Sequence, residues 1–207
     1  IPAASGTITD WIKLLPHILK LGFNTIHLLP ITLQDSSNSP YAAKDLFEID
    51  PRYLDSSLAH LSGWEQFEQF IATCQKLKIK LCLDLVLNHI GVNSRIVQQT
   101  ADWIVADPTE SDGLKRAGCF DQGQWHLWRD LVLLHYQHPK VPTRKALWHY
   151  MTDYALFWAN YANLTGGMIR LDNLHSTDQK FLKSVLERVR EEFPDLALYG
   201  EFFSDME

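Results

Sequence analysis

The sequence predicts an α/β fold built from successive parallel β/α units, and two observations predict it. Segments with apolar residues at helical spacing alternate along the chain with short apolar runs typical of strands. These runs are apolar throughout, as expected for parallel strands that are covered on both faces. A doubly wound sheet and a (β/α)8 barrel both fit this pattern. No GxGxxG or P-loop motif follows a strand, which disfavours a nucleotide-binding sheet.

Eight elements are predicted, and helices alternate with strands. They are a helix over 9–21, a strand over 24–30, a helix over 63–78, a strand over 79–87, a helix over 145–163, a strand over 168–172, a helix over 177–193 and a strand over 196–203. The helices carry apolar residues at helical spacing. Among the strands, the run IKLCLDLVL gives the strongest signal.

Capping and turn-forming residues set the expected ends of these elements. Thr9 or Asp10 is the predicted N-cap of the first helix, and Gly22 ends that helix. Pro30 stops the first strand. The segment QDSSNSPY is rich in turn formers and is predicted as a loop. Residues 90–143 contain helix-like pieces without a clean period.

Composition and charge exclude several classes of protein. With 207 residues, 46% of them apolar, the chain can form one domain with a hydrophobic core. A net charge of -6 supplies no basic face, so neither nucleic acid nor a membrane surface is an expected partner. No apolar run approaches the ~20 residues of a membrane span, and no leader opens the chain, so a cytoplasmic location is expected.

The cysteine and tryptophan residues give less information about the class of protein. Cys74, Cys82 and Cys119 show no metal-type spacing and fit a reducing compartment. The seven Trp are either core residues or flat surfaces on which sugar rings stack, and the sequence leaves both open.

Polar side chains gather where the predicted strands end. These residues are Asp84, Asn88, His89, Arg170, Asp172 and Glu201. Because the carboxyl ends of parallel strands share one edge, all six are expected near a single site, as in barrel enzymes. Each alone has a simpler explanation. A strand-end carboxylate often caps the next helix, an Arg–Asp pair is often a structural ion pair, and His89 could complete a turn. The whole set is harder to explain as structure.

Asp172 and Glu201 form the predicted catalytic pair. They are separated by about one β/α unit, so both can face one pocket. Two carboxylates across an acetal can run glycoside chemistry, one as nucleophile and the other as general acid/base, at a separation of about 5–5.5 Å in a retaining mechanism. The apolar neighbours of Glu201, which include Phe202 and Phe203, suit an acid that keeps its proton. Arg170, on the same strand face as Asp172, is expected to hold the nucleophile ionised.

Four motifs in order resemble the α-amylase superfamily of glycoside hydrolases. They are SPYAAKDLFEIDP (39–51), DLVLNH (84–89), GMIRLDNLH (167–175) and LYGEFF (198–203). The resemblance implies a partial (β/α)8 TIM barrel covering about strands 2 to 5. Residues 1–207 would be one partial catalytic domain, with 90–143 as an excursion between the third strand and the third helix.

Within this superfamily the chain looks most like the glucanotransferase domain of glycogen debranching enzymes. RLDNLHST (170–177), SNSPY (37–41) and GCFDQGQWHLWRDLV (118–132) carry this likeness. Ordinary amylases commonly have a Lys-His pair where this chain has His175 and Ser176. The resemblance implies transfer of maltooligosaccharide between α-1,4-glucan, glycogen or limit-dextrin chains. An α-glucan hydrolase and a noncatalytic glycan-binding module on the same fold are the alternatives.

Residue roles follow from the matching positions. Asp172 would be the nucleophile, Glu201 the acid/base, and Arg170 the residue that orients Asp172. The substrate-binding set would be Asp84, His89, Tyr41, His175 and Asn88. Tyr41 would stack on a sugar ring or simply pack, and His175 would contact a glucose hydroxyl or pack. Asn88 matches a calcium-ligand position of many amylases, but no metal and no cofactor is expected, because debranching-type members need not bind calcium.

The chain lacks parts of the family pattern. A first strand, the strands after the fifth and the third acidic residue of an Asn-His-Asp type motif are not found in it. We therefore expect these residues to be a segment of a longer polypeptide. Its remaining barrel and further domains would be partners of this segment, which alone would be inactive.

Overall fold

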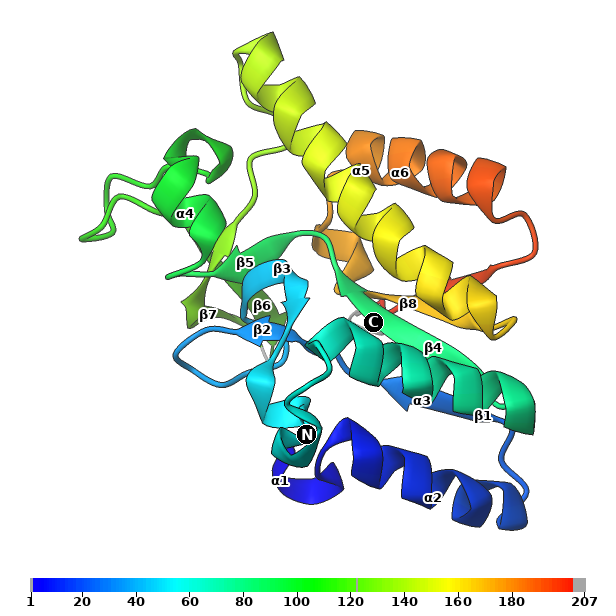
Figure 1. Cartoon of the computed structure of the whole chain (residues 1–207). Coiled ribbons are helices and arrows are strands. Elements are labelled where there is room, and N and C mark those ends of the chain that lie inside the picture. Colours follow the sequence, from blue (N-terminus) through cyan, green and yellow to red (C-terminus); the bar gives the residue numbers. More distant parts are fainter. Residues whose placement is uncertain (1, 122, 203–207) are drawn as a thin grey trace.

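The computed structural model describes residues 2–121 and 123–202, so Phe203 lies outside the described residues. A four-stranded parallel sheet runs through the molecule in the order β1-β4-β8-β9 (Figure 1). Its strands are β1 (Thr25–Leu28), β4 (Lys80–Val86), β8 (Met168–Asp172) and β9 (Ala197–Gly200). Every neighbouring pair is parallel. The prediction of parallel β/α construction is confirmed.

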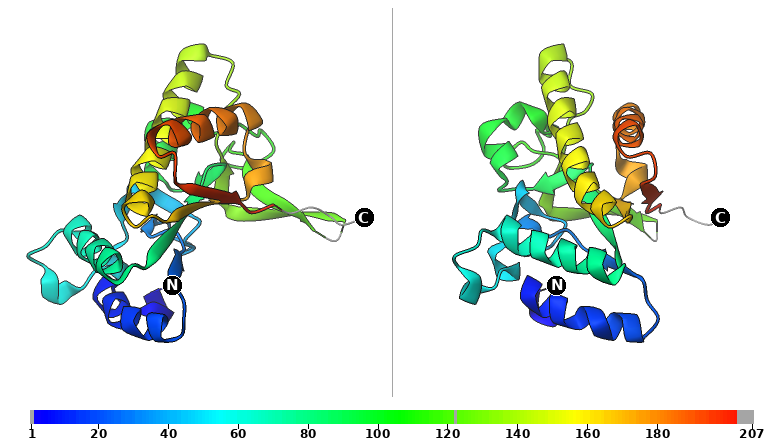
Figure 2. Two further views of the ribbon diagram at one scale, coloured as in Figure 1. Left: turned by 90° about the vertical axis from the view of Figure 1, so that its right-hand side faces the viewer. Right: turned by 45° about the vertical axis from the view of Figure 1, so that its right-hand side comes forward.

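The helices that precede or link these strands cover one face of the sheet (Figures 1 and 2). The four long ones are α2 (Ile8–Lys20), α3 (Gly63–Leu77), α5 (Val141–Leu164) and α6 (Gln179–Glu192), and α1 (Pro2–Ser5) is a single turn. α2 packs on α3, α3 on α5 and α5 on α6, in chain order. This leaves the other face of the sheet free to carry polar side chains. No described helix is long and apolar enough to cross a membrane.

The helix caps show that the predicted N-cap of α2 is wrong and explain why α6 begins later than predicted. The N-cap of α2 is Thr7, and neither Thr9 nor Asp10 holds that position. Asp10 instead sits at the third helical position and accepts a hydrogen bond from the Thr7 backbone at 3.1 Å, which makes a capping box. Asp178 caps α6 by accepting from two backbone N–H groups, so this helix begins two residues later than predicted. Gly22, with φ +87°, follows the end of α2 as expected.

Two antiparallel sheets in the connections were not predicted. One pairs β2 (Thr32–Gln34) with β3 (Ala43–Ile49) on either side of the predicted loop. The other, in the order β5-β7-β6, joins β5 (His89–Gly91), β7 (Gln124–Leu133) and β6 (Arg116–Asp121). Shorter elements complete the chain: α4 (Arg95–Gln99), η1 (Pro51–Tyr53), η2 (Ser56–Leu58), η3 (Ala101–Trp103) and η4 (Leu174–Ser176). The β6–β7 hairpin projects from the carboxyl end of the parallel sheet (Figure 2).

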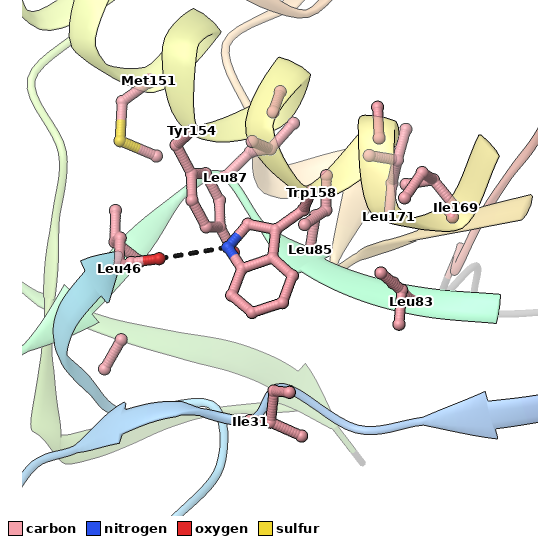
Figure 3. Close-up of a cluster of buried hydrophobic side chains, with 14 of the residues drawn as sticks. Ile31, Leu46, Leu83, Leu85, Leu87, Met151, Tyr154, Trp158, Ile169 and Leu171 are labelled. Carbon is pink, nitrogen blue, oxygen red and sulfur yellow. Dashed lines mark hydrogen bonds between the residues drawn. The ribbon is translucent and has the colours of Figure 1, made fainter. Parts of the chain in front are cut away.

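The core lies between the sheet and helix α5 (Figure 3). Leu83 and Leu85 point from β4 toward this helix, and Trp158 of α5 packs among them. The Trp158 indole donates a hydrogen bond to the Leu46 carbonyl at 3.1 Å, which satisfies its buried N–H and ties α5 to β3. Because the odd-numbered residues of β4 face the helices, the even-numbered ones, including Asp84, face the opposite side.

Candidate active site

Strand register brings the charged residues together on the free face of the sheet. Asp84 of β4 is the register partner of Arg170 on β8, and Val86 is the partner of Asp172. Residues two apart on a strand share a face, so Arg170 and Asp172 point to the same side as Asp84. Glu201 follows directly after β9 at the same edge. The strand-end residues therefore meet because the sheet is parallel.

One guanidinium binds three carboxylates. Arg170 Nη1 donates to Asp84 Oδ2 at 2.6 Å and to Asp172 Oδ1 at 3.1 Å. Its Nη2 lies 2.5 Å from Glu201 Oε1. We call these four residues the Arg170 cluster. Since the same cation contacts both predicted catalytic carboxylates, it fixes their positions relative to each other.

A tight turn after β8 holds the other side of Glu201. Asn173 adopts the left-handed conformation with φ 50°, which Asn tolerates better than most residues. Its backbone N–H donates to Glu201 Oε2 at 3.2 Å. The Leu174 N–H donates to the Glu201 carbonyl at 3.0 Å, and the Glu201 N–H donates to the Leu171 carbonyl at 2.9 Å. Both the backbone and the side chain of Glu201 are thus fixed by the β8 end and the following turn.

The electrostatics differ from what the sequence suggests. The pKa of Asp172 is raised to about 7, first by burial and then by the neighbouring Asp84, while Arg170 opposes the shift. Glu201 adds to the rise. Burial also raises the pKa of Asp84, although Arg170 and His27 counteract it. Arg170 therefore favours an ionised nucleophile as expected, but burial and two carboxylates outweigh it.

A cavity of about 340 Å³ opens onto the Arg170 cluster. Its lining residues are Ser39, Tyr41, His89, Trp128, Asp130, Leu131, Arg170, Asp172, Asn173 and Glu201. Three catalytic candidates and two of the five binding candidates thus share one concave site. Asp172, at the base of this cavity, is only 8% exposed, so its carboxylate is already largely shielded from water.

His89 presents polar atoms for a ligand. Its ring is buried, and among the described residues its one polar contact is with the Tyr41 backbone, too poorly aligned to satisfy either nitrogen fully. Burial lowers the pKa of His89 to about 4, so the ring is neutral at pH 7 and offers one donor and one acceptor. The edge of this ring meets Trp128 with centroids 6.0 Å apart. Burial raises the pKa of Tyr41 to about 12, and its hydroxyl lies 3.4 Å from Asp84 Oδ2.

Three binding candidates lie outside the cavity. Asp84 is buried beneath it and reaches it only through Arg170 and Tyr41, so it supports the site instead of lining it. Asn88 and His175 line a neighbouring cavity of about 540 Å³. His175 also meets the ring of Phe202 edge-on at 5.6 Å, and Phe202 is 67% exposed, so the apolar setting predicted around Glu201 is not present on that side.

The described residues do not fit a calcium site at Asn88. The side-chain oxygen of Asn88 is buried without a hydrogen-bond partner, which leaves one acceptor. Ca²⁺ takes six to eight oxygen ligands, commonly with several carboxylates. The described part of the chain brings no three His, Cys, Asp or Glu side chains together as a metal site.

Sequence reasoning missed five lining residues, one of which is the apolar Leu131 of β7. Trp128 and Asp130 come from β7, Asn173 from the turn after β8, and Ser39 from the loop before β3. The family resemblance implied that the excursion over 90–143 shapes the substrate groove, but the excursion held no clear strand signal that would single out Trp128. The motif RLDNLH contained Asn173, and an Asn directly after a strand-end Asp was the available signal for a left-handed turn.

Comparison with known proteins identifies the family. The family model of the glycogen debranching enzyme glucanotransferase domain matches residues 1–123, more than half of the chain. The chain belongs to this family. The match ends before β8 and β9, so Asp172 and Glu201 lie outside it.

Curated relatives resemble the chain over nearly all its length. The intracellular maltogenic amylase of Bacillus subtilis is 27% identical over 98% of this chain and 32% of its own length. The cyclomaltodextrinase of Geobacillus thermopakistaniensis is 25% identical over 97% of this chain and 32% of its own length. The debranching-family chain thus spans about a third of these relatives.

Solved structures show the same fold. An α-amylase from Lactobacillus plantarum superposes with a TM-score of 0.73 at 25% identity, covering 95% of this chain and 42% of that one. A cyclic α-maltosyl-(1→6)-maltose hydrolase from Arthrobacter globiformis, in complex with maltose, gives 0.71 at 26% identity, covering 96% and 43%. The prediction of a partial α-amylase-type barrel is confirmed, because the chain matches only part of such barrels.

Proposed function

We propose that the whole protein, the polypeptide that carries these 207 residues, is a retaining 4-α-glucanotransferase of the glycogen debranching type. Its substrates would be α-1,4-glucan, glycogen and limit dextrin. The observation that carries this proposal is the single guanidinium of Arg170 bound to both Asp172 and Glu201 at a cavity. The family match supports a glucan-transferring enzyme in particular.

The chemistry follows from the two carboxylates. Asp172 attacks the anomeric carbon while Glu201 gives its proton to the departing glycosidic oxygen, which frees the 4-hydroxyl end of the remaining glucan. A glycosyl ester on Asp172 results. Glu201, now ionised, takes the proton of an acceptor 4-hydroxyl as that oxygen attacks the anomeric carbon of the glycosyl ester. The bond to Asp172 breaks, and the anomeric configuration is retained after two displacements.

The neighbouring residues would serve each step. Arg170 holds Asp172 in place and stabilises its ionised form, which the attack requires. It also competes for Glu201, whose proton-bearing oxygen must turn from Arg170 or from the Asn173 N–H toward the substrate. His89 can bind a sugar hydroxyl as donor or acceptor, and the rings of Tyr41 and Trp128 provide apolar surface in the same cavity.

An α-glucan hydrolase is the second candidate, because curated relatives carry the names amylase and cyclomaltodextrinase. The two activities share the first half-reaction and differ in whether a sugar hydroxyl or water attacks the anomeric carbon of the glycosyl ester. A cytoplasmic location is also proposed, supported by a relative named as an intracellular enzyme.

The test is Asp172→Asn in the whole protein, incubated with maltooligosaccharides. Loss of the nucleophile should lower kcat by at least about 10³-fold while the fold is retained. Asp195→Asn, at an exposed carboxylate far from the cluster, should leave turnover unchanged. With the unaltered protein, redistributed chain lengths support transfer, whereas reducing ends that grow with time support hydrolysis. Undiminished turnover by Asp172→Asn would refute the nucleophile assignment.

A further inference from the structure

His27 on strand β1 contacts the Arg170 cluster through Asp84. It is the register partner of Cys82, and Asp84 lies two residues further along the same face of β4. His27 Nε2 lies 3.2 Å from Asp84 Oδ2. The same oxygen accepts from Arg170 at 2.6 Å and from the Tyr41 hydroxyl at 3.4 Å. Three donors thus converge on one carboxylate oxygen, and His27 is the one whose charge can change.

Counting charges shows why a second cation matters. Three ionised carboxylates around the single guanidinium of Arg170 leave two negative charges uncompensated in a largely buried site. The proposed catalytic state needs Asp172 ionised and Glu201 protonated, which still leaves one negative charge in excess. A protonated His27 makes the five groups neutral together. Neutrality favours ionised Asp172, because an uncompensated charge in a poorly solvated site is costly.

His27 is open to solvent on one side and faces the buried Asp84 on the other. Its side chain is 38% exposed, whereas that of Asp84 is fully buried. It borders a cavity of about 250 Å³ that is lined mainly by apolar residues such as Trp11 and Tyr53. The titratable or charged groups near His27 are Asp84 and Cys82 on β4, Arg170 on β8, Tyr41 before β3 and Tyr53 of η1. Asp84 is the acidic group among them that lies within hydrogen-bond distance of the ring.

We propose that His27 is a positioning residue that, as an imidazolium on Asp84, supplies the second positive charge of the active site. The inference rests on the proposed function, since it concerns the nucleophile assigned there. His27 holds Asp84 against Arg170, and its charge helps to keep Asp172 ionised. It does not touch the reacting atoms, so its effect belongs in the pH dependence of the reaction.

The test compares His27→Gln and His27→Lys in the whole protein. Gln keeps a hydrogen-bond donor and removes the charge, whereas Lys restores the charge. The acid limb of kcat/KM should move to higher pH by roughly half to one unit in His27→Gln, because the removed cation favoured ionised Asp172. Since the rate on that limb changes tenfold per pH unit, activity there should fall about three- to tenfold. His27→Lys should return the limb toward its original pH, and His17→Gln, at an exposed histidine of α2, should not move it.

The possible results distinguish failure of the His27 inference from failure of the proposed function on which it rests. A lower plateau in His27→Gln with an unmoved acid limb would mean that His27 only packs, and the inference would be wrong. If His27→Gln does not fold, His27→Asn takes its place, since it also removes the charge and keeps a hydrogen-bond donor; an unmoved limb in that variant would refute the inference. Loss of turnover in Asp172→Asn together with an unmoved limb in His27→Gln would refute the inference alone. Full turnover in Asp172→Asn would refute the proposed function first.

Discussion

At the scale of single residues, the site is a compromise around Arg170. Its guanidinium makes contacts of 2.6, 3.1 and 2.5 Å with three carboxylates, two of which are the proposed catalytic pair. Stability alone would favour fewer negative charges in so buried a place. The raised pKa of Asp172 reflects the unfavourable part of this arrangement. Such pKa shifts cluster at functional sites, which supports catalysis over a structural ion-pair network.

The raised pKa of Asp172 predicts a pH profile. A nucleophile must be ionised, and Asp172 ionises with a pKa of about 7. Activity should therefore rise with pH through this value, because Asp172 is protonated below it and ionised above it. The acid limb of kcat/KM, which reports the free enzyme, should lie near pH 7. Steady-state rates of the whole protein between pH 5 and 9 measure it.

A variant of Asp84 checks the cause of that limb. Asp84 is the largest cause of the shift after burial, so Asp84→Asn should move the acid limb to lower pH while it lowers the plateau by loosening Arg170. A limb that stays near pH 7 in this variant would show that the negative charge of Asp84 does not raise the pKa of Asp172.

At the level of single residues, the site residues that lie at strand ends could be predicted from the sequence. Those that reach the site only through strand pairing could not. Asp172 and Arg170 were predictable, because two residues on one strand share a face whatever surrounds them. Trp128 reaches the cavity from β7, which also pairs with β5, a strand distant from it in sequence. His27 stands in an apolar strand, and only the β1–β4 register brings it to Asp84.

At the scale of elements, the site depends on the turn from Asn173 to Thr177 packing against the end of β9. Gly200 makes this packing possible, since a Cβ there would collide with the Leu174 side chain. Leu174 is bonded through its N–H to the Glu201 carbonyl. A glycine next to the proposed acid/base therefore sets the distance between the turn and β9.

Gly200→Ala is expected to push this turn away from β9. Loss of the Asn173 contact to Glu201 Oε2 should lower kcat about 10- to 100-fold with little change in thermal stability, because Gly200 is exposed and free of left-handed strain. Gly113→Ala is the matched control. It adds backbone strain at φ +74° in a turn where nothing lies within 4 Å of the new methyl group, so it should cost about 1 kcal/mol and spare activity. Equal activity losses in both variants would contradict this role of Gly200.

Helices and buried strands were predictable, and the antiparallel excursions were not. The strand predicted over 168–172 has the observed bounds, and the helix predicted over 63–78 is one residue too long. These segments carry their own period and caps. β7 is mostly exposed along its first half, so no buried face marks its sequence, and it is held by pairing with β5 and β6.

At the scale of the whole molecule, the parallel sheet is open at both ends. Among the described residues, β1 pairs only with β4, and β9 only with β8. A (β/α)8 barrel closes by pairing its first and last strands, which abolishes edges. The turn that leads into β1 also exposes Leu21 at 60% and Phe23 at 61%. An open edge beside exposed apolar side chains is a template for association.

The 207-residue chain, produced on its own, is therefore expected to self-associate along β1. Light scattering after size-exclusion chromatography should show a mass that rises with concentration. Phe23→Lys places a charge beside the β1 edge and should shift the chain toward monomer. Phe120→Lys is the matched control, because Phe120 is similarly exposed, at 54%, but lies on the β6–β7 hairpin, and it should leave association unchanged. If both substitutions reduce association equally, exposed aromatic surface in general would be responsible, and the open edge of the barrel sheet would not.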